Sequence, residues 1–538
     1  MDNLNYQEMR FLIVDNIKPS QDILKQFAMR LTRAQVDSTH YAQDVAAICQ
    51  QANYDIILLG YDLGENQKNG QQILEELRTN DYIDRNCIVI LITAEVSQAM
   101  VLAALEHKPD HYLCKPYSLS ELNKRLYSCM RKKAAMAEIY QALDDEEPNI
   151  VIERCDSALQ KGTPYRTECL GIKSRQYFEL KEIEQAKKIY TLYRDTANCQ
   201  WASIGLGKVA LYEKKFTQAE SIFKNLIKKH PLYLSSYDWL AITYQEQFHF
   251  LFAEETLEQA LTLSPRSLNR LKRFANLCIH NKHFDKAATA YEKTYSLAKN
   301  SIHYSADNAI NYTHALIEHS PSLVLADAKK IHNKAFVWLK QMTKDFKGTD
   351  VKVHSHLLSA CLFEITREHT LANSELKLGE RLFHREQENI PDNELIKLSQ
   401  TLQKVSKSGL STEIQLPSTA SNVNERFKQN LSETLFKDTT KNRAQKALEH
   451  GLLLYQQKNY KQAVTALEKA LSLYPKHLGI KLNLLQAILL SYEMLNGEEG
   501  ELNRAKLLLN ELLTLNYQAD DLLRLKKMQK KYQQLAGI

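Results

Sequence analysis

A repeat of fixed period, between residues 200 and 299, is the strongest constraint on how this chain folds. A small residue recurs every 34 residues, at Gly207, Ala241 and Ala275. Each is followed 12 residues later by an alanine, at positions 219, 253 and 287. A regular period of this length is typical of stacked helical units, each of which cannot bury its apolar face alone.

Large apolar residues lie between these marks, and Pro231 and Pro265 close the first two units. The large residues are Leu206, Leu240, Tyr244, Phe216, Phe250, Phe284, Phe223, Leu257 and Tyr291. The pattern resembles the tetratricopeptide repeat, W-x2-L-G-x2-Y, then A-x3-F, then P. The resemblance implies antiparallel helix pairs that stack into a solenoid with a concave surface for protein partners.

The spacing also has a direct physical explanation. A small residue on the first helix and an alanine on the second allow the two helices to cross closely, while aromatic rings fill the space to the next pair. Proline cannot continue a helix, so it helps to end the second one. The spacing therefore predicts three helix pairs over residues 200–299.

Length and composition limit the class of protein. The chain has 538 residues, of which 44% are hydrophobic and 25% charged, which predicts two to four soluble domains. We expect a cytoplasmic protein, because no apolar run is long enough to span a membrane and the N-terminus lacks the features of a secretory signal. The nine scattered cysteines are expected to be reduced thiols. The net charge of +6 argues against nucleic acid as an obligatory partner.

The first 131 residues have a different pattern, in which short apolar runs alternate with helical stretches. Strands are predicted at residues 11–15, 35–38, 54–59, 87–92 and 110–114, and helices at 20–31, 70–78, 97–106 and 118–131. This alternation predicts an α/β domain with a doubly wound, five-stranded parallel sheet. In such sheets, the functional crevice lies at the carboxyl ends of the strands.

Polar residues and one glycine stand at those strand ends. The sequence reads VDN at 14–16, LLGYDLG at 58–64, LITA at 91–94 and LCKPY at 113–117. With these motifs, residues 9–131 resemble the receiver domain of two-component response regulators. The resemblance implies an acidic pair that holds magnesium at Asp15 and Asn16, phosphoryl contacts at Thr93 and Lys115, and a reorienting aromatic at Tyr112.

The chain departs from this family at the phosphoacceptor position, which is Gly60. Glycine has no side chain and cannot form an aspartyl phosphate. Asn16 replaces an acid, so Asp15 remains of the three expected carboxylates, and we expect no cofactor, with magnesium binding weakened at best. Asp62 lies two residues further on, in the loop. We expect Asp15 and Lys115 to pair in the pocket instead of serving phosphotransfer.

The remainder of the chain is predicted to be helical, with one exception. Residues 132–199 are a helical connector with a weak tetratricopeptide-like pair, residues 300–403 are irregular helical pairs, and residues 442–538 are further repeats with a capping helix. Residues 404–441 are rich in Ser, Thr and Asn and are predicted to form a linker or mobile loop, with an ordered surface loop as the alternative.

No nucleotide-binding, zinc-protease or serine-hydrolase motif occurs in the sequence, so we expect no enzyme. His354 and His356 form the closest approach to a metal pair, and we interpret both as surface residues. In the predicted register, the concave surface of the repeats carries Lys208, Tyr212, Gln245, Lys272, Asn276 and His280. Lys272 and Asn276 share a helix face, which fits a peptide carboxylate, although plain solvated surface explains them too.

These observations predict a signalling adaptor of the two-component type that binds protein partners through the receiver face and the solenoid groove, independently of phosphorylation. One alternative is a working phosphorelay regulator that uses Asp62. Another is a receiver pocket that binds a small ligand and controls the solenoid. RNA binding along the solenoid is a third, against which the modest net charge weighs.

Overall fold

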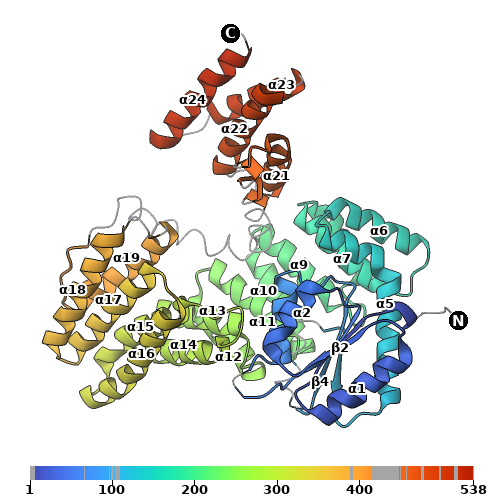
Figure 1. Ribbon diagram of the computed structural model, residues 1–538, viewed down its shortest axis with the longest axis horizontal. Helices are drawn as coiled ribbons and strands as arrows, with labels where there is room; N and C mark the ends of the chain where they lie inside the picture. Colours follow the sequence, from blue (N-terminus) through green and yellow to red (C-terminus); the bar gives the residue numbers. More distant parts are fainter. Residues whose placement is uncertain are drawn as a thin grey trace. The chain divides into compact units, whose positions relative to one another are not determined.

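The computed structural model describes residues 6–65, 67–95, 97, 102, 109–387, 390, 392–414, 447–448, 450–452, 454–455, 457–473, 478–495, 499–513 and 519–536. The chain divides into two compact units, residues 1–421 and 422–538. The first unit holds an α/β domain followed by stacked helices, and the second holds helices in its described part (Figure 1).

The α/β domain is built on a five-stranded parallel sheet in the order β2-β1-β3-β4-β5. Its strands are β1 (Phe11–Val14), β2 (Val36–Thr39), β3 (Ile56–Gly60), β4 (Ile88–Thr93) and β5 (His111–Cys114). All five were predicted, with ends that differ by one or two residues. The helices are α1 (Lys18–Leu31), α2 (Val45–Gln51), α3 (Gly70–Thr79) and α5 (Leu119–Asp144). The sequence analysis did not identify α2.

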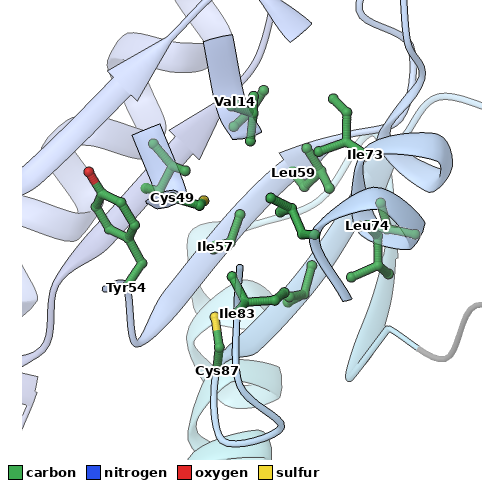
Figure 2. Packing of buried hydrophobic residues seen from close by; sticks show 14 of the residues in the cluster. Val14, Cys49, Tyr54, Ile57, Leu59, Ile73, Leu74, Ile83 and Cys87 are labelled. Atoms are coloured by element: carbon green, nitrogen blue, oxygen red, sulfur yellow. The ribbon is translucent and has the colours of Figure 1, made fainter. Parts of the chain in front are cut away.

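Alternate strand residues point to opposite faces of the sheet. Among the described helices, α2 and α3 lie against one face and α1 and α5 against the other. Val14, Ile57 and Leu59 pack with residues of α2 and α3, and Figure 2 shows Ile73 of α3 beside Leu59. The residues between them, such as Ile13 and Leu58, pack instead against α1 and α5. Central strands buried on both faces read as continuous apolar runs, which is why the sequence predicted them.

Two predicted helices differ from expectation or fall outside the structure. Helix α5 continues past residue 131 to Asp144, so the predicted end of the receiver-like domain lies inside a helix. The predicted helix at residues 97–106 lies outside the described residues except at 97 and 102. Helix α6 (Pro148–Gln160) begins with proline, whose missing N–H is harmless in a first turn.

The three predicted helix pairs of residues 200–299 are present. They are α9 (Gln200–Tyr212) with α10 (Phe216–Lys229), α11 (Ser235–Glu246) with α12 (Phe250–Leu263), and α13 (Leu268–His280) with α14 (Phe284–Ala298). The weaker pair before them is α7 (Arg166–Glu179) with α8 (Ile183–Tyr193). Pro231 and Pro265 each lie two residues after the end of a second helix.

The small residues lie at tight helix crossings, as predicted. Gly207 has so little room that an added Cβ would lie 2.2 Å from Cζ of Phe223. Ala219, Ala253 and Ala287 are fully buried. A larger residue at these positions would separate the helices. The 34-residue period therefore reflects the packing of helices and not the chemistry of the surface.

Several turns between paired helices have a left-handed residue that is not glycine. Positive φ angles occur at Lys181, Lys214, Phe248, Lys282, Arg367 and Lys458. In each turn the next residue donates its backbone N–H to a carbonyl five residues earlier, as Lys215 does to Ala210 at 2.7 Å. This is the hydrogen-bonding pattern of a Schellman motif, which satisfies the last carbonyl groups of the first helix.

The irregular region contains α15 (Ala306–His319), α16 (Leu325–Asp345), α17 (Thr349–Ile365), α18 (His369–Glu386) and α19 (Asp392–Lys407). Helix α19 ends at Lys407 and so includes the first four residues, 404–407, of the predicted linker. Most of that linker, from residue 415 to 441, lies outside the described residues.

The expectation that His354 lies on the surface is wrong. Its side chain is fully buried on α17, and its Nδ1 lies 2.8 Å from Oγ1 of Thr401 on α19. The same hydroxyl lies 3.0 Å from Nε2 of His314 on α15. Only the partly exposed His356, which pairs with Glu375 at 2.6 Å, fits the surface interpretation.

The second unit repeats the helical pattern in its described residues. It contains α21 (Tyr460–Leu473), α22 (Leu478–Leu495), α23 (Glu499–Leu513) and α24 (Ala519–Ala536). The predicted small position Gly451 lies beside Leu467, whose Cγ would be 2.8 Å from an added Cβ. Ala463, Ala470 and Ala505 are fully buried, which agrees with the predicted crossing positions.

Candidate functional site

The sheet register brings the predicted pocket residues to one edge. Val14 pairs with Leu59 and Gly60 pairs with Ile92, so Asp15, Gly60 and Thr93 follow one another across β1, β3 and β4. Thr93 pairs with Cys114, the residue before Lys115. Residues up to 100 positions apart therefore meet at the carboxyl edge of the sheet, as expected for a doubly wound fold.

Asp15 is the centre of this pocket, and both oxygens of its carboxylate have hydrogen-bond partners. The side chain is 2% exposed. Oδ1 accepts the backbone N–H of Ile17 at 2.9 Å, and Oδ2 accepts the hydroxyl of Ser20 at 2.7 Å. Nζ of Lys115 lies 3.0 Å from the same Oδ2 and 3.2 Å from Oγ of Ser20. The predicted Asp15–Lys115 pair is confirmed, and Ser20 is a third member that the sequence analysis missed.

The space beside Gly60 is tight. An added Cβ would lie 3.0 Å from the carbonyl oxygen of Val14 and 3.2 Å from Cδ2 of Leu63. Leu63 is 4% exposed, so its side chain packs over the position where a side chain of residue 60 would begin. On the other side, an added Cβ at Gly70 would lie 2.4 Å from the carbonyl oxygen of Gly60. Two glycines thus allow the first turn of α3 to approach the end of β3.

Thr93 and Tyr112 lie at the pocket but are engaged locally. The buried hydroxyl of Thr93 accepts the backbone N–H of Glu95 at 3.0 Å. The phenol of Tyr112 donates to the backbone carbonyl of Glu95 at 2.8 Å. Burial raises the pKa of Tyr112, so the phenol stays a donor at neutral pH. Both side chains therefore hold the segment that follows β4.

The two remaining predicted pocket residues, Asn16 and Asp62, have exposed side chains. Oδ1 of Asp62 accepts the backbone N–H of Gly64 at 3.1 Å, which makes it the cap of its own turn. Magnesium requires several oxygen ligands in octahedral geometry. Here the one buried carboxylate is held by a lysine, a hydroxyl and a backbone N–H, so these residues do not fit the magnesium site that the receiver family implies.

A second group of contacts, which the sequence analysis missed, joins this domain to the solenoid within the first unit. Tyr61 follows Gly60 and is buried, and its hydroxyl lies 3.5 Å from a guanidinium nitrogen of Arg266. Nε2 of Gln72 donates to the carbonyl of Leu297 at 3.2 Å, and Glu75 pairs with His303 at 2.7 Å. No local sequence signal marks contacts between residues about 200 positions apart.

The predicted concave residues of the first two repeats make separate contacts. The ammonium of Lys208 lies 4.3 Å from the ring centroid of Trp239, a cation–π geometry. Tyr212 is half exposed and meets Phe178 edge-on at 6.2 Å. Gln245 is partly buried.

The three predicted residues of α13 differ in exposure. The oxygen of the exposed Asn276 amide accepts the hydroxyl of Tyr291 at 2.5 Å, and the His280 ring lies 3.9 Å from that of Phe250. Lys272 is partly buried, and burial lowers its pKa while the carboxylates of Asp307 and Glu75 oppose this shift. A peptide carboxylate held by Lys272 and Asn276 together stays a prediction.

Within the described residues, no group of three or more His, Cys, Asp or Glu residues is arranged to hold a metal ion. None of the helices in this part of the chain combines the length and apolar character needed to cross a bilayer. All nine cysteines are free thiols, and eight of them are buried.

Two regions of the chain match known families. Residues 11–127 match the response regulator receiver domain, and residues 451–477 match the tetratricopeptide repeat. Curated relatives include the transcriptional regulatory proteins PmrA of Pectobacterium parmentieri (29% identical over 124 residues, 23% of this chain and 53% of that protein) and ResD of Bacillus subtilis (27% over 132 residues, 24% and 51%). The chain thus spans about half the length of the curated relatives it matches.

Solved structures with a similar fold include a two-component response regulator from Clostridium difficile, at 22% identity and a TM-score of 0.21, covering 23% of this chain and 97% of that one. A CheY-like receiver domain from Methanospirillum hungatei gives 20% identity and a TM-score of 0.22, covering 24% and 98%. The five-stranded parallel sheet, its register and the family match agree: this chain carries a response regulator receiver domain at its N-terminal end, together with a tetratricopeptide repeat.

Proposed function

We propose that this protein is a phosphorylation-independent adaptor of two-component signalling, in which a degenerate receiver and a helical solenoid bind protein partners. The observation that carries the proposal is the closed pocket. Residue 60 has no side chain, Leu63 packs over it, and Lys115 holds Asp15. Phosphoryl transfer needs a nucleophile, an open position beside it and charge stabilisation. The pocket lacks both the nucleophile and the open position beside it.

Asp62 is a poor substitute for the missing nucleophile. Its carboxylate is exposed and caps the turn that leads to Gly64. A candidate nucleophile must lie within reach of the groups that would activate it and stabilise its product. The Thr93 hydroxyl accepts a backbone hydrogen bond, and the Lys115 ammonium contacts Asp15 and Ser20.

The binding role rests on the helical pairs. Tetratricopeptide repeats form extended surfaces suited to peptides and protein segments. The family match to such a repeat and the six turns with the same Schellman pattern support this architecture for the helical region. We propose no enzymatic activity, since the sequence carries no nucleotide-binding, zinc-protease or serine-hydrolase motif.

The test is exposure of the full chain to acetyl phosphate and magnesium, with intact mass as the readout. Wild type and Asp62→Ala are compared, and a receiver with an intact acceptor aspartate serves as the positive control. We expect no stable phosphoryl adduct in either variant of this chain. An adduct in wild type that disappears in Asp62→Ala would refute the proposal and establish a displaced acceptor.

A further inference from the structure

The contact between the receiver and the solenoid joins unlike charges. The receiver side presents Glu75 of α3, which is 16% exposed in this contact, while the solenoid side presents His303, at 21%. Arg266 and Lys272 belong to the same side of the contact, because Arg266 reaches Tyr61 and Lys272 lies in the field of Glu75. An acidic group on a helix therefore faces a basic surface.

The solenoid side of this contact is held in place by its own hydrogen bonds. The carbonyl of His303 accepts the side-chain amide of Asn308 at 2.9 Å, and Asn308 is 2% exposed. The backbone N–H of His303 donates to Oγ of Ser301 at 3.2 Å. A loop fixed in this way loses little conformational freedom when a ligand binds, which favours its use as a recognition surface.

The receiver side is linked directly to the pocket. Helix α3 starts at Gly70, whose N–H donates to the carbonyl of Tyr61 at 2.8 Å, and Tyr61 follows Gly60. Ile73 and Leu74 anchor the helix in the receiver core, so Gln72 and Glu75 are presented on a rigid element. Gln72 adds donors to the carbonyls of Leu297 and Lys299, at 3.2 and 3.4 Å. The contact combines the Glu75–His303 pairing at 2.7 Å with hydrogen bonds of defined direction.

We infer that Arg266, Lys272 and His303 form a binding surface for an acidic segment of a protein partner, and that Glu75 of α3 occupies this surface until such a segment displaces it. The inference rests on the proposed adaptor function and adds the chemistry of the partner and its regulation. Lys272 is partly buried with the carboxylates of Asp307 and Glu75 nearby. Removal of Glu75 leaves His303 without its carboxylate and leaves Lys272 beside Asp307, so the carboxylate of a partner can take the place of Glu75.

The experiment measures binding of a fluorescein-labelled, glutamate-rich helical peptide to the full chain by fluorescence anisotropy. The Gln72→Ala/Glu75→Gln variant opens the contact. Glu121→Gln is the matched control, because Glu121 lies on α5 of the receiver and pairs with Arg125 of the same helix. We expect the open variant to bind the peptide at least about tenfold more tightly than wild type and the control to match wild type. Adding Lys272→Met to the open variant should remove the gain.

Amide hydrogen exchange of residues 297–305 in the same proteins verifies that the contact opens without unfolding of the solenoid. Faster exchange in this segment with tighter peptide binding supports the inference. Faster exchange with unchanged affinity overturns it, as does a gain in affinity that survives Lys272→Met. Unchanged exchange also overturns it, since α3 would then not hold this segment. These outcomes are independent of the phosphoryl adduct, which tests the proposed function separately.

Discussion

The receiver pocket and the histidine cluster of the solenoid both bury polar side chains, but they satisfy them differently. In the pocket, the charge of Asp15 is balanced by Lys115 and supported by Ser20 and a backbone N–H. In the solenoid, His314 and His354 share a single hydroxyl, that of Thr401, and within the described residues Nε2 of His354 has no hydrogen-bond partner. The pocket therefore holds a paired carboxylate, whereas burial in the cluster disfavours the charged form of the two imidazoles.

The two regions therefore differ in how strongly their stability depends on protonation. Burial lowers the pKa of His314 to about 3 and that of His354 to about 4, and burial likewise lowers the pKa of His332 to about 4. Between these values and the ordinary pKa near 6.5, the unfolded chain binds protons that the folded chain does not. Stability from these residues is therefore complete above about pH 6.5 and is lost as the pH falls below it.

The largest expected effect is that of acidification, which should destabilise the histidine cluster more than the other helices. At about pH 5, the free energy of unfolding should fall by about 2 kcal/mol for each of the three buried histidines. Hydrogen-exchange protection factors, corrected for intrinsic rates, should drop in α15–α19 before they drop in α9–α12, where His249 is exposed and His230 ends α10. Equal loss of protection in both regions would contradict the assignment of acid sensitivity to the cluster.

A smaller effect is expected from removal of the shared hydroxyl. Thr401→Val leaves two buried imidazoles without their common partner, which should lower the free energy of unfolding by about 1–3 kcal/mol. Urea denaturation measures the change, and Thr289→Val, at an exposed threonine of α14, serves as the control with an expected effect below about 0.5 kcal/mol. A Thr401→Val variant as stable as the control would show that the hydroxyl is dispensable.

The smallest effect is expected in the pocket. Lys115→Met removes the cation beside Asp15 but leaves the hydrogen bonds from Ser20 and Ile17, so a loss of about 1–2 kcal/mol is expected in place of the larger cost of a wholly unpaired buried charge. Thermal unfolding monitored by near-ultraviolet circular dichroism checks this value. A loss above about 4 kcal/mol would mean that Lys115 alone compensates Asp15.

The sequence allowed prediction of elements whose residues interact locally. Strands buried on both faces appear as apolar runs, and helix crossings appear as small residues such as Gly207 at a fixed period. The pair of Asp15 and Lys115 was predictable because parallel strands end at one edge. The environment of His354 was not, because Thr401 reaches it from another helix. For the same reason, the Glu75–His303 contact could not be predicted from the local sequence pattern.

The central claim is that the receiver pocket is closed by its own residues and takes neither magnesium nor a phosphoryl group. Leu63 packs over Gly60, so its methyl signals report directly on any change in the pocket. Methyl NMR of the leucine- and isoleucine-labelled chain, recorded before and after addition of magnesium with beryllofluoride, follows its resonance. We predict unchanged signals for Leu63 and for Ile92, which pairs with Gly60. Saturable shifts of these signals that are lost in Asp62→Ala would contradict the account.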